Sequence, residues 1–281
     1  MFPAELPFDF TRIPPGPAAK DLVAWWWATS WDLPSGHHSS QELLAFPASN
    51  LAFEMDQVRF WGPTTRRSTR VLVGQGWVLG ALLRPAAVPA FTQKPAACRD
   101  DSVPVSALEL HETVQASSGS LAAVIDEVEG WLAHHVGPLT DEAHQANRLA
   151  DLAITDSTIA TVQDLAGALG ISTRTVNRLT TKYVGLSPYT MIRRRRLQEA
   201  TEWIRDNPDE TLADVAVRYG FVDQAHLSRE ARTLLGMTLE VSRVLFLGLC
   251  LDFHYFSTGV VFPKFGFDFS RRAVAQALVE P

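Results

Sequence analysis

A helix-turn-helix pattern at residues 162–179 constrains this chain more than any other stretch. Apolar residues spaced for one helix face lead to Gly170, which stands where a left-handed residue ends a helix. Ser172 then predicts the N-cap of a second helix whose Val176 and Leu179 turn inward. A short helix, a glycine turn and a capped helix with Arg and Asn on its outer face form the layout that enters a DNA major groove.

The same pattern recurs at residues 212–232. Its first helix has an apolar inward face and is ended by Gly220. Phe221 follows as a buried corner, and Asp223 begins the second helix, which carries Gln, His and Arg on its outer face. The sequence therefore predicts two helix-turn-helix motifs in tandem.

A single long helix is predicted to join the two motifs. Ser187 is its expected N-cap, Pro188 suits its first turn, and no helix breaker follows before Asp206. At about 1.5 Å per residue, such a helix spans about 30 Å. It is long enough to hold the two motifs in adjacent segments of the major groove.

These stretches resemble the DNA-binding domain of the AraC/XylS family of regulators. The resemblance is carried by GLSPY at 185–189, RL at 196–197, Ala200, DVA at 214–216 and YGFVDQAHLSR at 219–229. It implies a transcription regulator, with activation favoured, that binds double-stranded DNA, contacts RNA polymerase and forms a homodimer. The chain departs from the family at three places: Ala231 replaces a usual phenylalanine, Leu239 a proline, and Val241-Ser242 a tyrosine-arginine pair.

Side chains on the outer faces of the two second helices are the candidates for reading bases. Arg can bridge O6 and N7 of guanine, and Asn or Gln can bridge N6 and N7 of adenine. The candidates are Arg174, Thr175, Asn177 and Arg178 in the first motif, and Gln224, His226 and Arg229 in the second. The two groups would read successive major-groove segments about one helical turn apart.

Phosphate contacts are expected from the basic stretch and from helix starts. The candidates are Ser172, Lys182, Ser187, Arg193, Arg194 and Arg232. The whole chain has a net charge of −6, but residues 171–205 contain eight Lys or Arg and only two Glu. Such a basic stripe in an acidic chain suits specific DNA binding. The alternative for residues 193–196 is that they point around their helix, with Arg196 turned inward to an acid.

The region from residue 22 to about residue 110 has the texture of a β domain. Short apolar runs alternate with Pro, Gly, Asn and Ser clusters, whereas the proline-rich residues 1–20 are predicted to be an extended arm. Stretches at 46–54, 61–66 and 80–85 resemble the cupin-like N-terminal domain of some regulators of this family. The predicted fold class is therefore α+β: a small β-barrel followed by an all-α domain.

Tryptophans concentrate in this β domain and suggest a pocket for an apolar or aromatic effector. Six of the eight tryptophans lie there. The candidate lining residues are Trp25, Trp27, Phe53, Trp61 and Trp77. Alternation along a strand places Trp26 on the opposite face from its two neighbours. The alternative is that these rings simply fill the core of the domain, and a protein partner could replace the small molecule as the signal.

Catalytic and metal-binding patterns are weak. The pairs His37-His38 and His134-His135 diverge on any regular element, and neither has the spacing of a metal site. Neither a metal, a cofactor nor an enzymatic activity is predicted. The alternative is a cupin-type metalloenzyme domain fused to a DNA-targeting module. Two distant cysteines and the lack of a long apolar run or signal peptide favour a cytoplasmic protein that does not enter membranes.

A helical stripe at residues 120–136 allows two interpretations. Its apolar residues Leu121, Val124, Val128 and Leu132 recur at helical spacing. The stripe can pair with its own copy across a two-fold axis, as dimerisation helices of the family do, or it can pack on its own β domain. With Gly137-Pro138 as a breaker, the predicted domains are 1–119, the linker or dimer helix 120–138, the DNA-binding domain 139–245 and an extension 246–281.

The extension is rich in phenylalanine and has no counterpart in the family pattern. Seven of the fifteen phenylalanines lie there. Ala231 is expected on the buried side of its helix, where a missing phenylalanine would leave a void. The prediction is that Phe246, Phe253 and Phe256 fold back to fill it.

Overall fold

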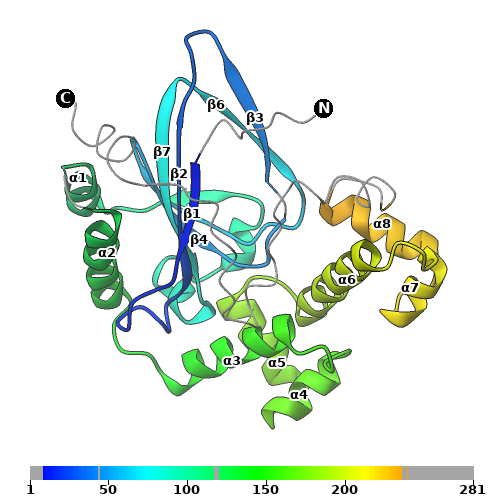
Figure 1. Ribbon diagram of the computed structural model, residues 1–281. Helices are drawn as coiled ribbons and strands as arrows, with labels where there is room; N and C mark the ends of the chain where they lie inside the picture. The colour runs from blue at the N-terminus through cyan, green and yellow to red at the C-terminus, as the bar shows by residue number, and fades with distance from the viewer. Residues whose placement is uncertain (1–8, 44, 117–119, 236–238, 240–281) are drawn as a thin grey trace.

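The computed structural model describes residues 9–43, 45–116, 120–235 and 239 (Figure 1). Its strands are β1 (Asp9–Ile13), β2 (Val23–Asp32), β3 (His38–Leu43), β4 (Asn50–Glu54), β5 (Val58–Trp61), β6 (Ser68–Val73), β7 (Gln75–Leu83) and β8 (Ser102–Pro104). Its α-helices are α1 (Leu108–Ala116), α2 (Leu121–Val136), α3 (Asp141–Thr155), α4 (Val162–Leu169), α5 (Thr173–Tyr183), α6 (Pro188–Asp206), α7 (Leu212–Arg218) and α8 (Gln224–Leu235). Two 3-10 helices, η1 (Pro85–Ala90) and η2 (Pro95–Cys98), follow β7. Strands therefore precede helices along the chain, as the predicted α+β class requires.

The strands form an open sheet and a separate ribbon. Six strands pair antiparallel in the order β1-β2-β7-β4-β5-β8, and β3 pairs with β6 alone. Among the described strands, the edges β1 and β8 are not joined, so the closed barrel that the sequence suggested is not what these strands form. The proline-rich arm was also misread in part, because Asp9–Ile13 pairs with β2 as an edge strand.

Alternation along β2 divides its tryptophans between two faces of the sheet. Trp26 is fully buried, whereas Trp25 and Trp27 are half-buried on the opposite face. Gly80 pairs with Trp27 across the sheet, and a Cβ on Gly80 would lie 2.1 Å from Trp27 Cε2. Only glycine at this position lets the indole lie across β7.

Helix α2 packs on the sheet of its own β domain, beside α1 (Figure 1). Val124, Val128 and Leu132 are at most 3% exposed and belong to the same core as Trp26. Leu121 is half-buried against that core. The apolar stripe predicted to form a dimer contact is therefore buried within the chain, and a face that covers its own sheet is not available to a second copy. The structure shows the second of the two arrangements, in which the stripe packs on its own β domain.

The C-terminal helices build two further cores, one for each helix-turn-helix motif. Helices α3, α4, α5 and the start of α6 share the first core, which also includes Ala86 from η1. The second half of α6, with α7 and α8, forms the other core. Helix α6 thus takes part in both cores and lies between the two motifs, as Figure 1 shows. The predicted linker helix is confirmed as a helix of 19 residues.

The predicted inward position of Ala231 is confirmed, since Ala231 is fully buried in the second motif. The phenylalanines expected to pack against it, at 246–281, lie outside the described residues.

Charging the buried face of α2 should unfold the β domain. Val128→Glu places an unpaired carboxylate at a fully buried site, and we expect a loss of at least about 3 kcal/mol in unfolding free energy. Ala123→Glu is the control, since Ala123 lies on the exposed face of the same helix. Chemical denaturation, monitored by tryptophan fluorescence, measures the unfolding free energy of both variants. If Val128→Glu remained folded and merely changed the oligomeric state, this packing would be contradicted.

Candidate nucleic-acid interface

The first motif forms because its local signals agree with one another. Thr161 and Asp164 make a reciprocal capping box at the start of α4, and Gly170 ends that helix in the left-handed region with φ of 66°. Ser172 accepts a hydrogen bond of 3.1 Å from the Thr175 backbone amide and so begins α5. The predicted turn and cap are confirmed.

Helix α5 presents a polar face to solvent. Val176 and Leu179 are fully buried behind it, while Arg174, Asn177 and Arg178 are exposed. Of the other predicted contacts in this motif, Thr175 is half-buried with its hydroxyl 3.0 Å from that of Ser172. Lys182 is exposed at the end of the helix.

The second motif repeats this arrangement on α8. Gly220 has φ of 68°, Phe221 is buried, and Asp223 accepts a 2.6 Å hydrogen bond from the His226 amide at the start of the helix. Gln224, Arg229 and Arg232 are exposed on α8. His226 differs from them. Its ring lies edge-on to Phe221, and its Nδ1 accepts a hydrogen bond of 3.3 Å from the Val222 amide, so it lies partly inward.

Four consecutive arginines on α6 point to four different neighbours. At about 100° per residue, adjacent helical side chains fan out around the helix axis. Arg193 forms an ion pair with Glu230 of α8, whose side chain is 9% exposed. Arg196 donates to the backbone oxygens of Tyr219 and Gly220, the turn that ends α7. Both side chains therefore fasten the second motif to the linker helix.

The other two arginines turn toward the first motif and the β domain. Arg195 is 4% exposed, and its Nη2 donates a 2.6 Å hydrogen bond to the Ile159 oxygen just before α4. Arg194 is 8% exposed and lies with its guanidinium 5.6 Å from the ring centre of Phe46 in the β domain. Burial away from water lowers the pKa of Arg194.

The predicted phosphate contacts of the linker helix need correction. Arg194 is buried, and Arg193 is engaged with a nearly buried carboxylate, so neither presents a free cation to a DNA backbone. Arg196 does turn inward, but to carbonyl oxygens instead of the acid that was expected. Ser187 is exposed and caps α6, with its Oγ accepting from the Thr190 amide at 3.1 Å. The sequence shows charge but does not show which side of a helix it occupies.

Glu142 of α3 is the contact that sequence reasoning missed. Its carboxylate lies 2.6 Å from Arg178 Nη1 and 2.7 Å from Lys182 Nζ, and it accepts a 3.2 Å hydrogen bond from the Tyr183 hydroxyl. The hydrogen bonds from Lys182 and then Arg178 lower the pKa of Glu142 to about 2. The carboxylate is therefore ionised at neutral pH. It neutralises part of the face on which α5 was expected to meet DNA.

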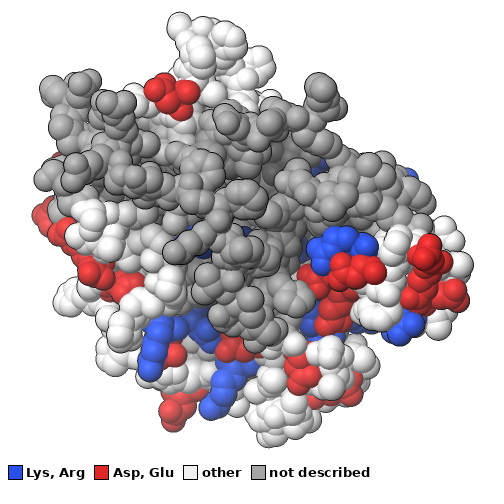
Figure 2. Space-filling model, viewed as in Figure 1, with Lys and Arg blue, Asp and Glu red and all other residues white. Residues whose placement is uncertain are grey.

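The surface charges follow the same pairing. Figure 2 shows Lys and Arg in small groups beside Asp and Glu on the face that it draws, in both helix-turn-helix motifs. The described residues on this face form no continuous basic band. The basic stripe of the sequence is thus divided between internal contacts and a few exposed cations.

The β domain rests directly on the turn that follows α5. Gly185 has φ of 82°, and a Cβ there would lie 2.6 Å from the Pro95 carbonyl carbon of η2. Arg99 Nη2 donates a 2.9 Å hydrogen bond to the Gly185 oxygen. Nearby, the buried Asn147 of α3 accepts from the Ala86 amide at 2.9 Å and donates to the Asp21 oxygen at 2.8 Å. The turn at the end of α5 is therefore held against η2 and Arg99 of the β domain.

The predicted tryptophan pocket is divided between the two faces of the sheet. Phe53 and Trp77 belong to the core on the α2 side, with Trp26. Trp25, Trp27 and Trp61 are half-buried on the other face, where Trp27 Nε1 donates to Asn50 Oδ1 at 3.1 Å. The five side chains do not line one pocket.

Within the described residues, no three His, Cys, Asp or Glu side chains gather closely enough to hold a metal ion. The described helices also include none that is long and apolar enough to cross a membrane.

Two family models match the chain in separate regions. Residues 165–243 match a model described as a helix-turn-helix domain, and residues 11–104 match one described as a domain of unknown function (DUF6597). No curated protein sequence matches the chain.

Several solved structures are similar to the chain at low identity. One is ToxT from Vibrio cholerae O395, with 9% identity, coverage of 86% of this chain and 99% of that chain, and a TM-score of 0.40. Another is wild-type ToxT from V. cholerae strain SCE256 bound to an unsaturated fatty acid, with 10% identity, coverage of 73% and 94%, and a TM-score of 0.36. A third is the AraC-like transcriptional activator CuxR, with 14% identity, coverage of 69% and 86%, and a TM-score of 0.27.

The matches and the geometry define the class of protein: a helix-turn-helix regulator with a sheet-rich N-terminal region. More narrowly, the matched helix-turn-helix domain takes in residues 165–243, the stretch that includes most of the residues whose sequence resembles the AraC/XylS family.

Removing the Glu142 charge should strengthen DNA binding. Glu142→Gln releases Arg178 and Lys182, so we expect affinity for any duplex to rise several-fold and the salt slope of binding to steepen by about one unit. Asp141→Asn removes the same charge from the neighbouring, exposed residue and should change little. Fluorescence anisotropy over a salt series measures both. Equal effects of the two variants would show that only net charge matters.

Proposed function

We propose that this protein binds an asymmetric DNA site with α5 and α8 in successive major-groove segments. The observation that carries the proposal is the position of α6, which contributes to the cores of both motifs and joins them without a flexible linker. Two recognition helices held in this way suit two short stretches of base pairs, or blocks, about one helical turn of DNA apart. Because both helix-turn-helix motifs lie in one polypeptide, a single chain can occupy the whole DNA site.

The exposed side chains suggest how the work is divided. Arg174, Asn177 and, once released from Glu142, Arg178 would read one block. Gln224 and Arg229 would read the other block. Phosphate contacts would come from exposed Lys182 and Arg232 and from the amide-bearing starts of α5 and α6 at Ser172 and Ser187.

The β domain is proposed to carry the regulatory signal. It holds the turn after α5 through Gly185 and grips α3 through Asn147. A ligand or partner that changes this docking changes the freedom of the first recognition helix, which is the requirement for coupling. In this proposal the outcome at a promoter is activation through contact with RNA polymerase.

Selection of bound duplexes from a random pool tests the proposal. The wild-type chain should enrich sequences with two conserved blocks about one helical turn apart. Arg174→Ala should relax one block and Arg229→Ala the other, each at a cost of about 1–3 kcal/mol on the wild-type site. Arg148→Ala removes an exposed arginine from α3, which is not one of the two recognition helices, and should leave both blocks intact.

No enrichment over the starting pool would contradict DNA reading itself. If the selected DNA contained a single block that Arg174→Ala and Arg229→Ala weakened equally, the proposed division of base reading between α5 and α8 would be contradicted.

A further inference from the structure

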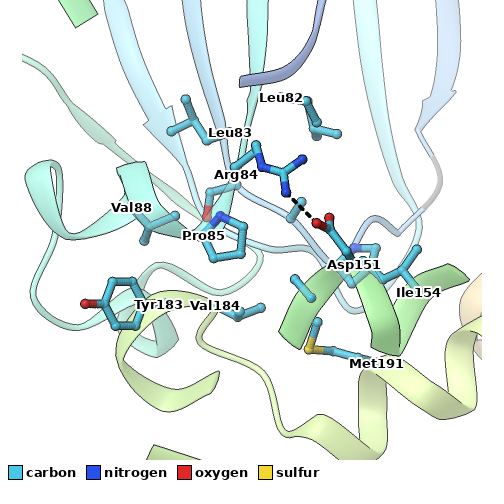
Figure 3. Close-up of a pocket in the computed structure, with 15 residues that line it drawn as sticks. Leu82, Leu83, Arg84, Pro85, Val88, Asp151, Ile154, Tyr183, Val184 and Met191 are labelled. Carbon is cyan, nitrogen blue, oxygen red and sulfur yellow. Dashed lines mark hydrogen bonds and ion pairs between the residues drawn. The ribbon is translucent and has the colours of Figure 1, made fainter. Parts of the chain in front are cut away.

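The β domain and the first motif meet along a seam that reaches the end of the first recognition helix. Arg84, just after β7, donates a 2.5 Å hydrogen bond to Asp151 of α3 across this seam (Figure 3). Val88 of η1 lines the same narrow cavity as Tyr183 and Val184 at the end of α5 (Figure 3). The cavity measures about 30 Å³ and has room for little more than water. The segment that follows β7 therefore lies close to the end of α5.

The next part of this segment, residues 91–99, includes η2 and is called the η2 loop below. Its first residue, Phe91, stacks on Phe60 of the sheet core with the ring centres 5.5 Å apart. Its η2 turn packs directly on the backbone that follows β5, because a Cβ on Gly62 would lie 2.0 Å from the Cys98 carbonyl oxygen. The side chains of the η2 loop are therefore carried by a part of the β domain that is packed at both ends.

The η2 loop touches the chain just before the start of α6. A Cβ on Gly185 would lie 2.6 Å from the Pro95 carbonyl carbon, so the two backbones are in contact. Arg99 Nη2 donates a 2.9 Å hydrogen bond to the Gly185 oxygen from the other end of η2. Ser187, the N-cap of α6 and a proposed phosphate contact, follows two residues after Gly185. Lys94, which directly precedes Pro95, and Arg99 therefore flank this contact on the β-domain side.

Lys94 and Arg99 are both exposed, and neither forms an ion pair within the described part of the chain. The two acids that follow Arg99 are engaged elsewhere. Asp100 accepts hydrogen bonds from the Thr65 amide at 2.7 Å and from the Thr65 hydroxyl at 2.6 Å. Asp101 accepts a 2.7 Å hydrogen bond from the amide of the next residue. The two cations are therefore available to an anion outside the protein.

The cations at the end of α5 are less available than this pair. Arg178 and Lys182 share the carboxylate of Glu142, at 2.6 and 2.7 Å, and must give up that contact to meet DNA. A phosphate that reaches the start of α6 meets Lys94 and Arg99 without the loss of an ion pair. Because binding to phosphates is set by the cations that neutralise them, the two β-domain charges are the readier partners at this point.

We infer that the β domain itself contacts DNA: Lys94 and Arg99 of the η2 loop bind backbone phosphates beside the block that α5 reads. This inference rests on the proposed function, since it needs α5 in the major groove. The two side chains read no base, so they contribute equally on every sequence and add to affinity without adding to specificity. The contact also gives the β domain a direct part in DNA binding, because a shift of this domain along the seam moves two phosphate contacts.

The salt dependence of DNA binding by the full-length protein tests this contact. Fluorescence anisotropy over a salt series gives the slope of log K against log salt for a selected duplex and for a random duplex. Lys94→Gln and Arg99→Gln should each make the slope shallower by about one unit, and the double variant by about two units. Affinity should fall several-fold in each single variant, by the same factor on both duplexes, because only phosphate contacts are lost.

Charge-retaining variants separate a phosphate contact from a structural effect. Lys94→Arg and Arg99→Lys should keep the wild-type slope, because each retains its positive charge. Arg99 also holds the Gly185 oxygen, so a purely structural role would be disturbed in Arg99→Lys as well as in Arg99→Gln. Gln93→Ala changes an exposed, uncharged neighbour in the same loop and should leave the slope unchanged.

Hydroxyl-radical footprinting on the selected duplex locates the contact. The double variant should lose protection of the DNA backbone beside the first block and keep the protection of both blocks. A wild-type slope in Lys94→Gln and Arg99→Gln, or an equal loss of slope in the charge-retaining variants, would overturn the inference while the proposed function stands. If the wild-type protein itself showed no salt-dependent binding to DNA, the proposed function would fail and the inference with it.

Discussion

The rest of the structure depends on four consecutive arginines of α6, Arg193–Arg196, which point in different directions around the helix. A helix turns by about 100° at each residue, so Arg193–Arg196 cannot share one face. Arg193 and Arg196 hold the second motif, Arg195 holds the segment before α4, and Arg194 lies on Phe46 of the β domain. A single turn of helix therefore fixes three bodies relative to one another. Removing Arg193 leaves the nearly buried Glu230 carboxylate without its counterion, which is strongly unfavourable.

This use of arginine changes how the charge of the chain is understood. Local excess of Lys and Arg suggested a broad electrostatic footprint, but Arg193–Arg196 of α6 are engaged by other groups of the protein. On the first motif, Glu142 offsets two further cations. Fewer free charges mean weaker nonspecific attraction to phosphates, so base contacts carry a larger share of recognition. Breaking the contacts of Glu142 with Arg178 and Lys182 would then change both the nonspecific attraction to phosphates and the base contacts.

Local signals in the sequence predicted most of the helical region, and long-range packing escaped it. The caps at Ser172 and Ser187 and the glycine stops at Gly170 and Gly220 depend on neighbouring residues, so they are readable along the chain. The amphipathic stripe of α2 shows that one face is buried but not against what, and the structure sets it on its own sheet. Likewise, Arg84 and Asp151 meet across the seam although nothing in either local sequence signals the other.

Salt dependence of DNA binding by Arg193→Met tests the central claim most directly. If Arg193 is an internal fastener between α6 and α8, the variant should melt at a lower temperature but keep the wild-type slope of log K against log salt. Arg232→Met, an exposed cation on α8, serves as the reference and should lose about one unit of slope. A slope that falls by about one unit in Arg193→Met, with unchanged melting, would show that Arg193 contacts phosphate and would contradict the account.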